Sequence, residues 1–176
     1  ELRETLLSSG GSVIEIPVPK IIWNDGPVEN QNLARFEWIV IGDAFAAEWF
    51  IRHFASAEDL DSARFCSLGE STAEALRLAQ IHSDVIPSRT DPKSSVEALL
   101  QYETDLSGIN VVVVASFEYA ERLSDELIAT GAVVSRFDAY RAEFESKSEI
   151  ARVRSLFIGG AIDEFYFLDP TEITFL

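Results

Sequence analysis

The chain is poor in sulfur-containing residues and in long apolar runs. It has one cysteine and no methionine among its 176 residues. A lone thiol forms no disulfide within the chain, and Cys66 lies in an apolar segment, which indicates a small buried side chain in a reducing compartment. No apolar run reaches the roughly 18 residues that a membrane-spanning helix needs. We therefore expect a cytoplasmic protein with no membrane partner.

Basic residues are also scarce, since 14 Lys and Arg stand against 30 Asp and Glu, for a net charge of −16. Nucleic acids require a basic face, so they are not expected partners. No G-x-G-x-x-G or Walker sequence is present, and neither His53 nor His82 has a partner at metal-ligand spacing. The sequence thus predicts no cofactor and no metal. The net negative charge of the chain repels an anionic ligand, so local backbone amides and hydroxyl groups would have to bind it.

Segments with strand periodicity alternate with segments of helical periodicity along the chain, and 47% of the residues are hydrophobic. Four consecutive valines, 111–114, are typical of a parallel strand buried on both faces. The alternation predicts an α/β fold with doubly wound parallel sheets. Expected strands are 12–17, 36–41, 63–68, 83–86, 110–115, 133–140 and 165–168; expected helices are 2–8, 44–54, 71–80, 94–102, 118–130 and 149–157, with one more begun at 169–172.

Polar turns follow the expected strands at 42–44, 69–72, 115–118 and 168–171. In doubly wound folds, ligands bind at the carboxyl ends of strands, next to helix N-termini. Ser71 and Glu74 have the S-x-x-E spacing of a capping box, and the free amides of that first turn would attract an anion. From the residues alone, plain helix capping is favoured over anion binding for Ser71 and Thr72, and the same two interpretations apply to Ser116.

A succession of segments, rather than one diagnostic motif, characterises the chain. The segments are, in order, Glu37–Val40, Leu68–Arg77, Ser83–Pro87, Val96–Leu100, Asp105–Gly108, Leu123–Leu127, Gly131–Val134 and Ala139–Arg141. In this order the chain resembles the uroporphyrinogen-III synthase family, over most of its length.

The resemblance implies two α/β domains joined by a two-stranded connection, with one domain split between the two ends of the chain. Residues 36–142 would form the continuous domain, and 1–18 with 148–176 would form part of the split domain. Residues 19–35 and 143–147 would be connecting segments. The first strand and roughly the last third of the family's split domain have no counterpart in this sequence, so that domain is expected to be incomplete.

The resemblance also implies an activity, which is the cyclisation of hydroxymethylbilane, a linear tetrapyrrole polycarboxylate, without a cofactor. Hydroxide leaves, a spiro intermediate forms, and the last ring is inverted. Tyr140 matches the tyrosine that is the family's usual candidate for assisting departure of the hydroxyl; a strand-end aromatic packed at a domain hinge is an equal alternative from the residues alone. The substrate-binding residues expected from the match are Gly69, Ser71, Thr72, Ser116, Phe117, Asp43 and Thr171. We expect a monomer whose only partner is this small-molecule substrate.

The chain departs from the family pattern at two turns. Where the family usually has Phe-Thr-Ser, this chain has Ile41-Gly42-Asp43 and Phe167-Leu168-Asp169. Asp caps a helix as well as Ser does, but an ionised Asp donates no hydrogen bond and repels carboxylates. The alternatives to an active synthase are therefore an inactive family member that binds a tetrapyrrole or another partner, and a sensor of a small anion.

Overall fold

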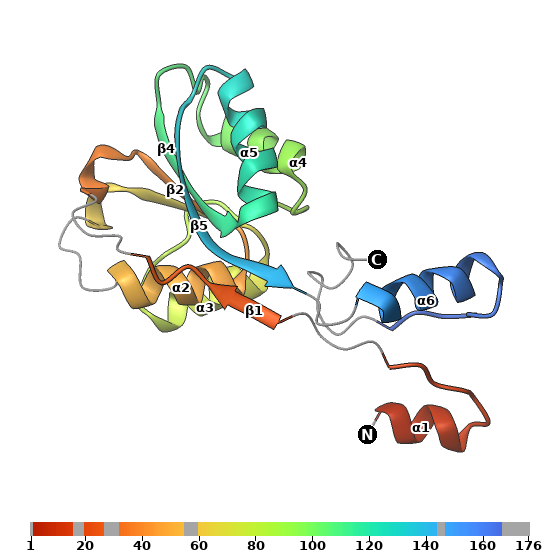
Figure 1. The fold of residues 1–176 in the computed structure, drawn as a ribbon. Helices are drawn as coiled ribbons and strands as arrows, with labels where there is room; N and C mark the ends of the chain where they lie inside the picture. The colour runs from red at the N-terminus through yellow and green to blue at the C-terminus, as the bar shows by residue number, and fades with distance from the viewer. Residues whose placement is uncertain (1, 16–19, 27–31, 55–59, 144–146, 167–176) are drawn as a thin grey trace. The chain divides into compact units, whose positions relative to one another are not determined.

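The computed structural model describes residues 2–15, 20–26, 32–54, 60–143 and 147–166. The elements are α1 Leu2–Ser8, β1 Lys20–Trp23, η1 Leu33–Arg35, β2 Trp38–Ile41, α2 Ala44–Phe54, η2 Leu60–Ser62, β3 Arg64–Ser67, α3 Glu70–Leu78, α4 Pro92–Tyr102, β4 Asn110–Ser116, α5 Phe117–Ala129, β5 Val133–Glu143 and α6 Lys147–Ile158 (Figure 1). The strand and helix alternation confirms the predicted α/β class.

Two compact units make up the chain: residues 21–141 form one, and 1–20 with 142–176 form the other. The larger unit therefore also takes in residues 21–35, which the sequence assigned to a connecting segment. Lys20–Trp23 form β1, an edge strand of the five-stranded sheet, next to β5. Backbone pairing continues past β1, where the Asn24 amide donates to the Ala139 carbonyl at 2.9 Å.

The sheet has the order β1-β5-β4-β2-β3, and β2 pairs in parallel with both β3 and β4, as β4 does with β5. The strand order reverses at β2: β3, the next strand in sequence, lies on one side of β2, and β4 lies on the other. Such a switch point is where doubly wound folds bind ligands. The expected strand 83–86 is reduced to one parallel bridge between Val85 and Cys66.

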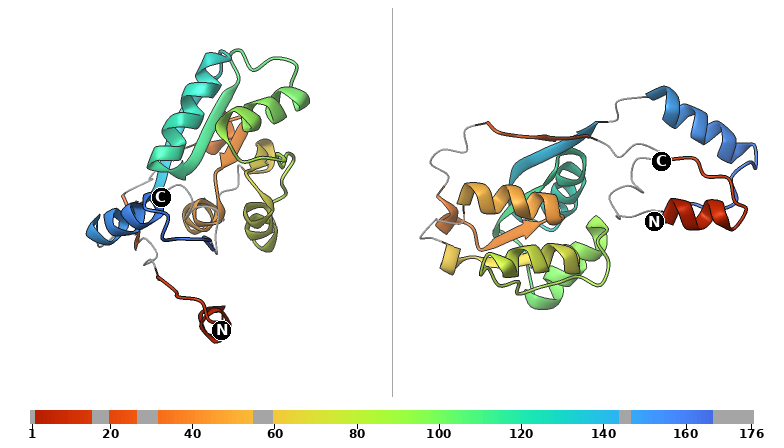
Figure 2. Two further views of the ribbon diagram at one scale, coloured as in Figure 1. Left: turned by 90° about the vertical axis from the view of Figure 1, so that its right-hand side faces the viewer. Right: turned by 90° about the horizontal axis from the view of Figure 1, so that it is seen from below.

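Helices cover both faces of this sheet. Figures 1 and 2 show α2 and α3 together, and α4 and α5 together. One buried cluster includes Ile39, Ile41, Trp49, Phe50 and Leu76, and it packs under α2 and α3. The other lies under α4 and α5, and it includes Trp38, Val40, Leu99, Leu123 and Leu127. Alternate residues of β2 face opposite clusters, which is why an unbroken apolar strand is needed there.

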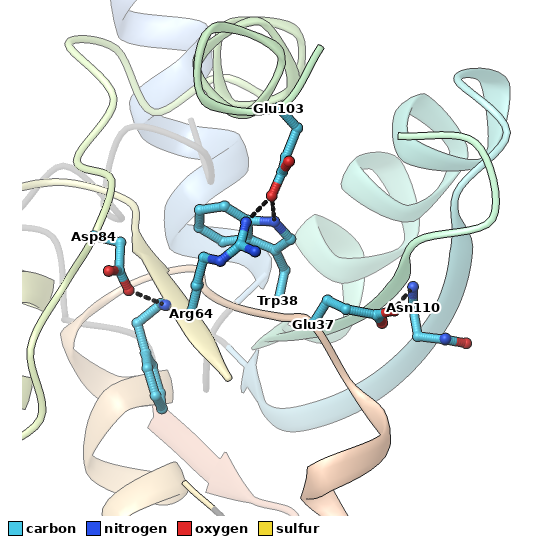
Figure 3. Close-up of polar contacts among 7 residues, drawn as sticks. Glu37, Trp38, Arg64, Asp84, Glu103 and Asn110 are labelled. Atoms are coloured by element: carbon cyan, nitrogen blue, oxygen red, sulfur yellow. Dashed lines mark hydrogen bonds and ion pairs between the residues drawn. The ribbon is translucent and has the colours of Figure 1, made fainter. Parts of the chain in front are cut away.

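Side-chain contacts fasten the amino ends of the parallel strands, as Figure 3 shows. The indole N–H of Trp38 donates to Glu103 Oε1 at 3.1 Å, and Arg64 forms an ion pair with the same carboxylate. Glu37 accepts a hydrogen bond from the Asn110 amide at 2.9 Å. Because Trp38 is fully buried, its N–H would otherwise lack a partner, at a cost of about 1–3 kcal/mol. The polar side chains at the amino ends of the strands are thus engaged in contacts that stabilise the fold.

In the smaller unit, α1 and α6 are confirmed, whereas Ser12–Glu15 form no strand. A strand needs a hydrogen-bonding neighbour, and the only strand residues in the described part of this unit are Lys20 and 142–143, the ends of β1 and β5. Phe165 and Tyr166 have no regular structure either. The expected helix start at 169–172 lies outside the described residues.

Candidate functional site

The carboxyl ends of β2, β3 and β4 meet at one edge of the sheet, opposite the fastened edge. The Gly42 amide donates to the Val114 carbonyl at 2.8 Å, and the Leu68 amide donates to the Ile41 carbonyl at 2.9 Å. Ser116 at the end of β4 lies opposite Tyr140, after a register shift between Ala115 and Ser116. This shift brings Tyr140 of β5 to the same edge.

Tyr140 and Asp43 contact each other directly. The Tyr140 hydroxyl donates to Asp43 Oδ2 at 2.7 Å, across 97 residues of sequence. The second oxygen, Asp43 Oδ1, accepts from the Ala46 amide at 2.8 Å and so caps α2, as predicted. The Tyr140 ring is almost fully buried, with edge-on contacts to Phe45 and Trp23 at centroid distances of 5.7 and 6.0 Å. Packing and the hydrogen bond together fix this side chain.

A pocket of about 440 Å³ opens beside Tyr140 within the larger unit. This volume falls in the range usual for small-molecule sites. Asn24 Nδ2 donates to the Asp138 carbonyl at 2.9 Å and holds the two strand ends together there. The lining residues are Ile22, Trp23, Asn24, Phe117, Glu118, Asp138, Tyr140 and Arg141. The pocket therefore combines aromatic walls with one arginine and two carboxylates.

The charges of this pocket are partly balanced by Arg136. Its Nε lies 2.9 Å from Asp138 Oδ1 in an ion pair, and its guanidinium lies 5.1 Å from the centroid of the Phe117 ring. Burial raises the pKa of Asp138 above its ordinary value, Arg136 lowers it in part, and Glu121 and Glu118 raise it further. Asp138 therefore holds its proton more tightly in the folded protein than in the unfolded chain.

Substituting Asp138 by asparagine should consequently raise the urea midpoint at pH 7. A raised pKa means that the folded state binds more protons than the unfolded state, so stability falls as pH rises through the interval between the two values. The gain in Asp138→Asn should shrink as the pH is lowered towards 3, where the carboxyl is protonated in both states. Urea titrations at several pH values measure this.

The matched control is Asp105→Asn, because hydrogen bonds from Ser107 lower the pKa of Asp105. A lowered pKa gives the opposite sign, so this variant should lose stability at pH 7. Equal responses of the two variants would contradict the assignment of Asp138 as the group that burial disfavours.

Two helices at this edge start without a side-chain cap. The N-cap of α3 is Gly69, which has a φ of +99°, and that of α5 is Ser116, whose side chain makes no capping hydrogen bond. Their first-turn amides are thus not satisfied by a capping side chain, which suits them to an anion. Glu70 and Glu118 stand in these first turns and reduce the attraction.

The capping box predicted for Ser71 is wrong. The helix begins at Glu70, which places Ser71 inside the first turn, exposed, because the positive φ of Gly69 turns the chain into the helix earlier. Thr72 is fully buried and its hydroxyl donates to the Leu68 carbonyl at 2.9 Å. The side chain of Thr72 therefore fixes the turn from within.

The structure brings together only some of the predicted site residues. Tyr140 and Phe117 line the pocket, Asp43 bonds to Tyr140, and Ser116 adjoins Phe117. Gly69, Ser71 and Thr72 follow β3, beyond β2, and do not line the pocket. Thr171 lies outside the described residues. In the described part of the chain, no group of three or more His, Cys, Asp and Glu could hold a metal, and no helix could span a membrane.

Five polar or aromatic lining residues were not among the predicted site residues: Trp23, Asn24, Glu118, Asp138 and Arg141. Trp23 and Asn24 lie within 19–35, which was interpreted as a connecting segment, although the apolar Ile21 and Ile22 are a signal for a strand. Arg141 directly follows Tyr140 and could have been chosen as the nearest cation.

Solved structures with a similar fold are uroporphyrinogen III synthases. A mutant enzyme from the extremely thermophilic bacterium Thermus thermophilus has 15% identity and a TM-score of 0.73, with 98% of this chain and 69% of that chain covered. The wild-type enzyme from the same organism has 16% identity and a TM-score of 0.70, with 99% and 70% covered. The enzyme from Helicobacter pylori has 14% identity and a TM-score of 0.54, with 88% and 73% covered. At these identities the likeness concerns the fold.

Sequence comparison extends the likeness from fold to family. No curated protein sequence matches the chain. The family model described as uroporphyrinogen-III synthase HemD, however, matches residues 1–175, which is nearly the whole sequence. The chain therefore belongs to the uroporphyrinogen-III synthase family.

Proposed function

We propose that this chain cyclises hydroxymethylbilane to uroporphyrinogen III, with inversion of the last pyrrole ring, in tetrapyrrole biosynthesis. Family membership supports the reaction class. The observation that carries the proposal is the position of Tyr140, the residue predicted to assist departure of the hydroxyl. It lines a pocket of about 440 Å³ formed by β1, β5 and the start of α5, next to the carboxyl end of β4.

The first chemical step of this proposal needs a proton. The substrate hydroxyl leaves as water when the Tyr140 O–H transfers its proton to the departing oxygen. The C–O bond breaks, its electron pair stays on that oxygen, and the substrate ring system carries the positive charge. The last ring then attacks this electrophile to form the spiro intermediate, which opens and closes again with that ring inverted. The proton released when the ring regains its aromatic form returns to the Tyr140 oxyanion. No cofactor enters these steps.

Binding of the substrate uses two kinds of contact in this proposal. Aromatic side chains of the pocket, Trp23, Phe117 and Tyr140, contact a pyrrole ring. Arg141 and the first-turn amides of α3 and α5 hold carboxylates. Amide contacts suit a chain of net charge −16, because a helix start offers a local positive potential without a basic side chain.

Isomer analysis of the product tests the proposal. Purified protein is given freshly prepared hydroxymethylbilane, and the products are oxidised and separated by isomer. Type III product above the level formed without protein is expected. Formation of the spontaneous type I isomer alone would show that the chain is not a synthase.

A second candidate function is a binding module of the same family that has lost catalysis. The hydrogen bond from Tyr140 to Asp43 favours this candidate, because it engages the only proton of the proposed acid. Titration with a stable tetrapyrrole polycarboxylate separates the two: binding that quenches tryptophan fluorescence, with Trp23 in the pocket, but no type III product would identify the binding module.

A further inference from the structure

The carboxylate of Asp43 has two roles, one for each of its oxygen atoms. Asp43 Oδ1 caps α2 through the Ala46 amide, and Oδ2 accepts the hydroxyl proton of Tyr140 at 2.7 Å. A phenol has one proton to donate. In this arrangement the Tyr140 proton is donated in a hydrogen bond to Asp43, and it is therefore not directed at the substrate.

We propose that Asp43 is a positioning residue that acts through Tyr140 by holding its hydroxyl proton and so slows the proton transfer to substrate. The inference rests on the proposed synthase function. It assigns to one residue, placed where the family usually has serine, control over the rate of the first step.

The physical reason is the charge that the transfer leaves behind. When the Tyr140 proton moves to the departing hydroxyl, water forms and the phenol becomes an oxyanion. That oxyanion then lies within hydrogen-bond distance of an ionised carboxylate, and two negative charges at this separation repel each other. Burial of Tyr140 against Phe45 and Trp23 limits the water that could screen them. A neutral side chain at 43 would remove the repulsion.

Asparagine is the appropriate replacement because it separates the two roles of Asp43. Asn caps a helix about as well as Asp, so α2 keeps its start. Its size is the same, and while its oxygen caps α2 in place of Oδ1, its NH2 group takes the place of Oδ2 and donates to the Tyr140 oxygen instead of accepting from it. The variant therefore loses the negative charge and, with it, the acceptor that holds the Tyr140 proton.

Steady-state kinetics of type III formation test the inference with four proteins: wild type, Asp43→Asn, Tyr140→Phe and the double variant. Asp43→Asn should raise kcat about fivefold and change KM by less than about twofold. The rise should vanish in the Tyr140→Phe background, because Asp43 acts through that hydroxyl. Asp105→Asn, which removes the same charge from a side chain bonded to the Ser107 amide near the amino end of β4, should leave kcat unchanged.

The same four proteins give a readout that does not depend on catalysis. In urea unfolding, the losses from Asp43→Asn and Tyr140→Phe should sum to more than the loss in the double variant, because both remove one interaction. Additive losses would show that the pair does not form, and would overturn the inference even in an active enzyme. Coupled losses with an equal or lower kcat in Asp43→Asn would also overturn it. Coupled losses without type III product from any variant would instead remove the synthase function, and with it the inference.

Discussion

Replacing Tyr140 by phenylalanine is expected to lower kcat for type III formation about 100-fold, the lower end of what a positioned general acid contributes. Without the phenol, the departing hydroxyl must take its proton from water. The ring itself stays, so its edge-on contacts with Phe45 and Trp23 are kept. KM should change little, because the lost group acts on the leaving oxygen. Initial rates with isomer separation measure both constants.

Tyr102→Phe is the matched control for this variant. Tyr102 lies at the opposite, fastened edge of the sheet, where its ring packs against Trp38 at 5.2 Å. It loses the same hydroxyl, and kcat should stay at the wild-type value. A loss of type III product in Tyr102→Phe equal to that in Tyr140→Phe, or full activity in Tyr140→Phe, would take Tyr140 out of the mechanism.

The central sheet could be predicted because its residues allow no other structure. The valines of 111–114 are apolar on both faces, and a strand that short with two apolar faces must be buried between helices. β2 has the same character, with Trp38 and Val40 facing one cluster and Ile39 and Ile41 the other. The sequence of each strand alone therefore predicts that both of its faces are buried, whichever strands lie beside it.

Helix starts were predicted less well, because several residues compete for the same role. The helix expected over 94–102 starts at Pro92, and Asp91 caps it by accepting from the Ser94 amide at 3.0 Å. A proline fits the first helical position, where its missing N–H is not needed. At α3 the conformation of Gly69 decides the start, and the positive φ of a glycine is not visible in its neighbours.

The site was predictable in part, for a different reason. Turns that follow parallel strands all lie at the carboxyl edge of the sheet, so Asp43 and Ser116 could be grouped in advance. That Tyr140 reaches Asp43 depends on the register shift at the end of β4 and on the length of β5. Neither is set by local sequence, since β5 gains its pairing from β1 and β4, which are separate segments of the chain. The pocket depends on the same contacts.

Substituting Gly42 by alanine is expected to impair both stability and catalysis. A Cβ atom at this position would lie 2.6 Å from Ala115 Cβ and 3.3 Å from Ala115 Cα, so the ends of β2 and β4 must move apart. Overpacking of this kind costs about 1–3 kcal/mol of unfolding free energy. Ser116, which lies opposite Tyr140, follows Ala115, and a displacement of about 1 Å of the Tyr140 hydroxyl from the leaving oxygen can reduce kcat about 100-fold. Urea unfolding and initial rates measure the two effects.

A compensating substitution tests whether this contact is the cause. In the double variant Gly42→Ala, Ala115→Gly the methyl group is transferred from β4 to β2, so the clash is removed while the total side-chain volume stays the same. The double variant should recover most of the lost stability and rate, although glycine within a strand costs about 0.5–1 kcal/mol. Ala115→Gly alone should show only that smaller loss. If the losses of the two single variants simply add, the approach of β2 to β4 is not what requires glycine at 42, and the position of Tyr140 does not depend on it.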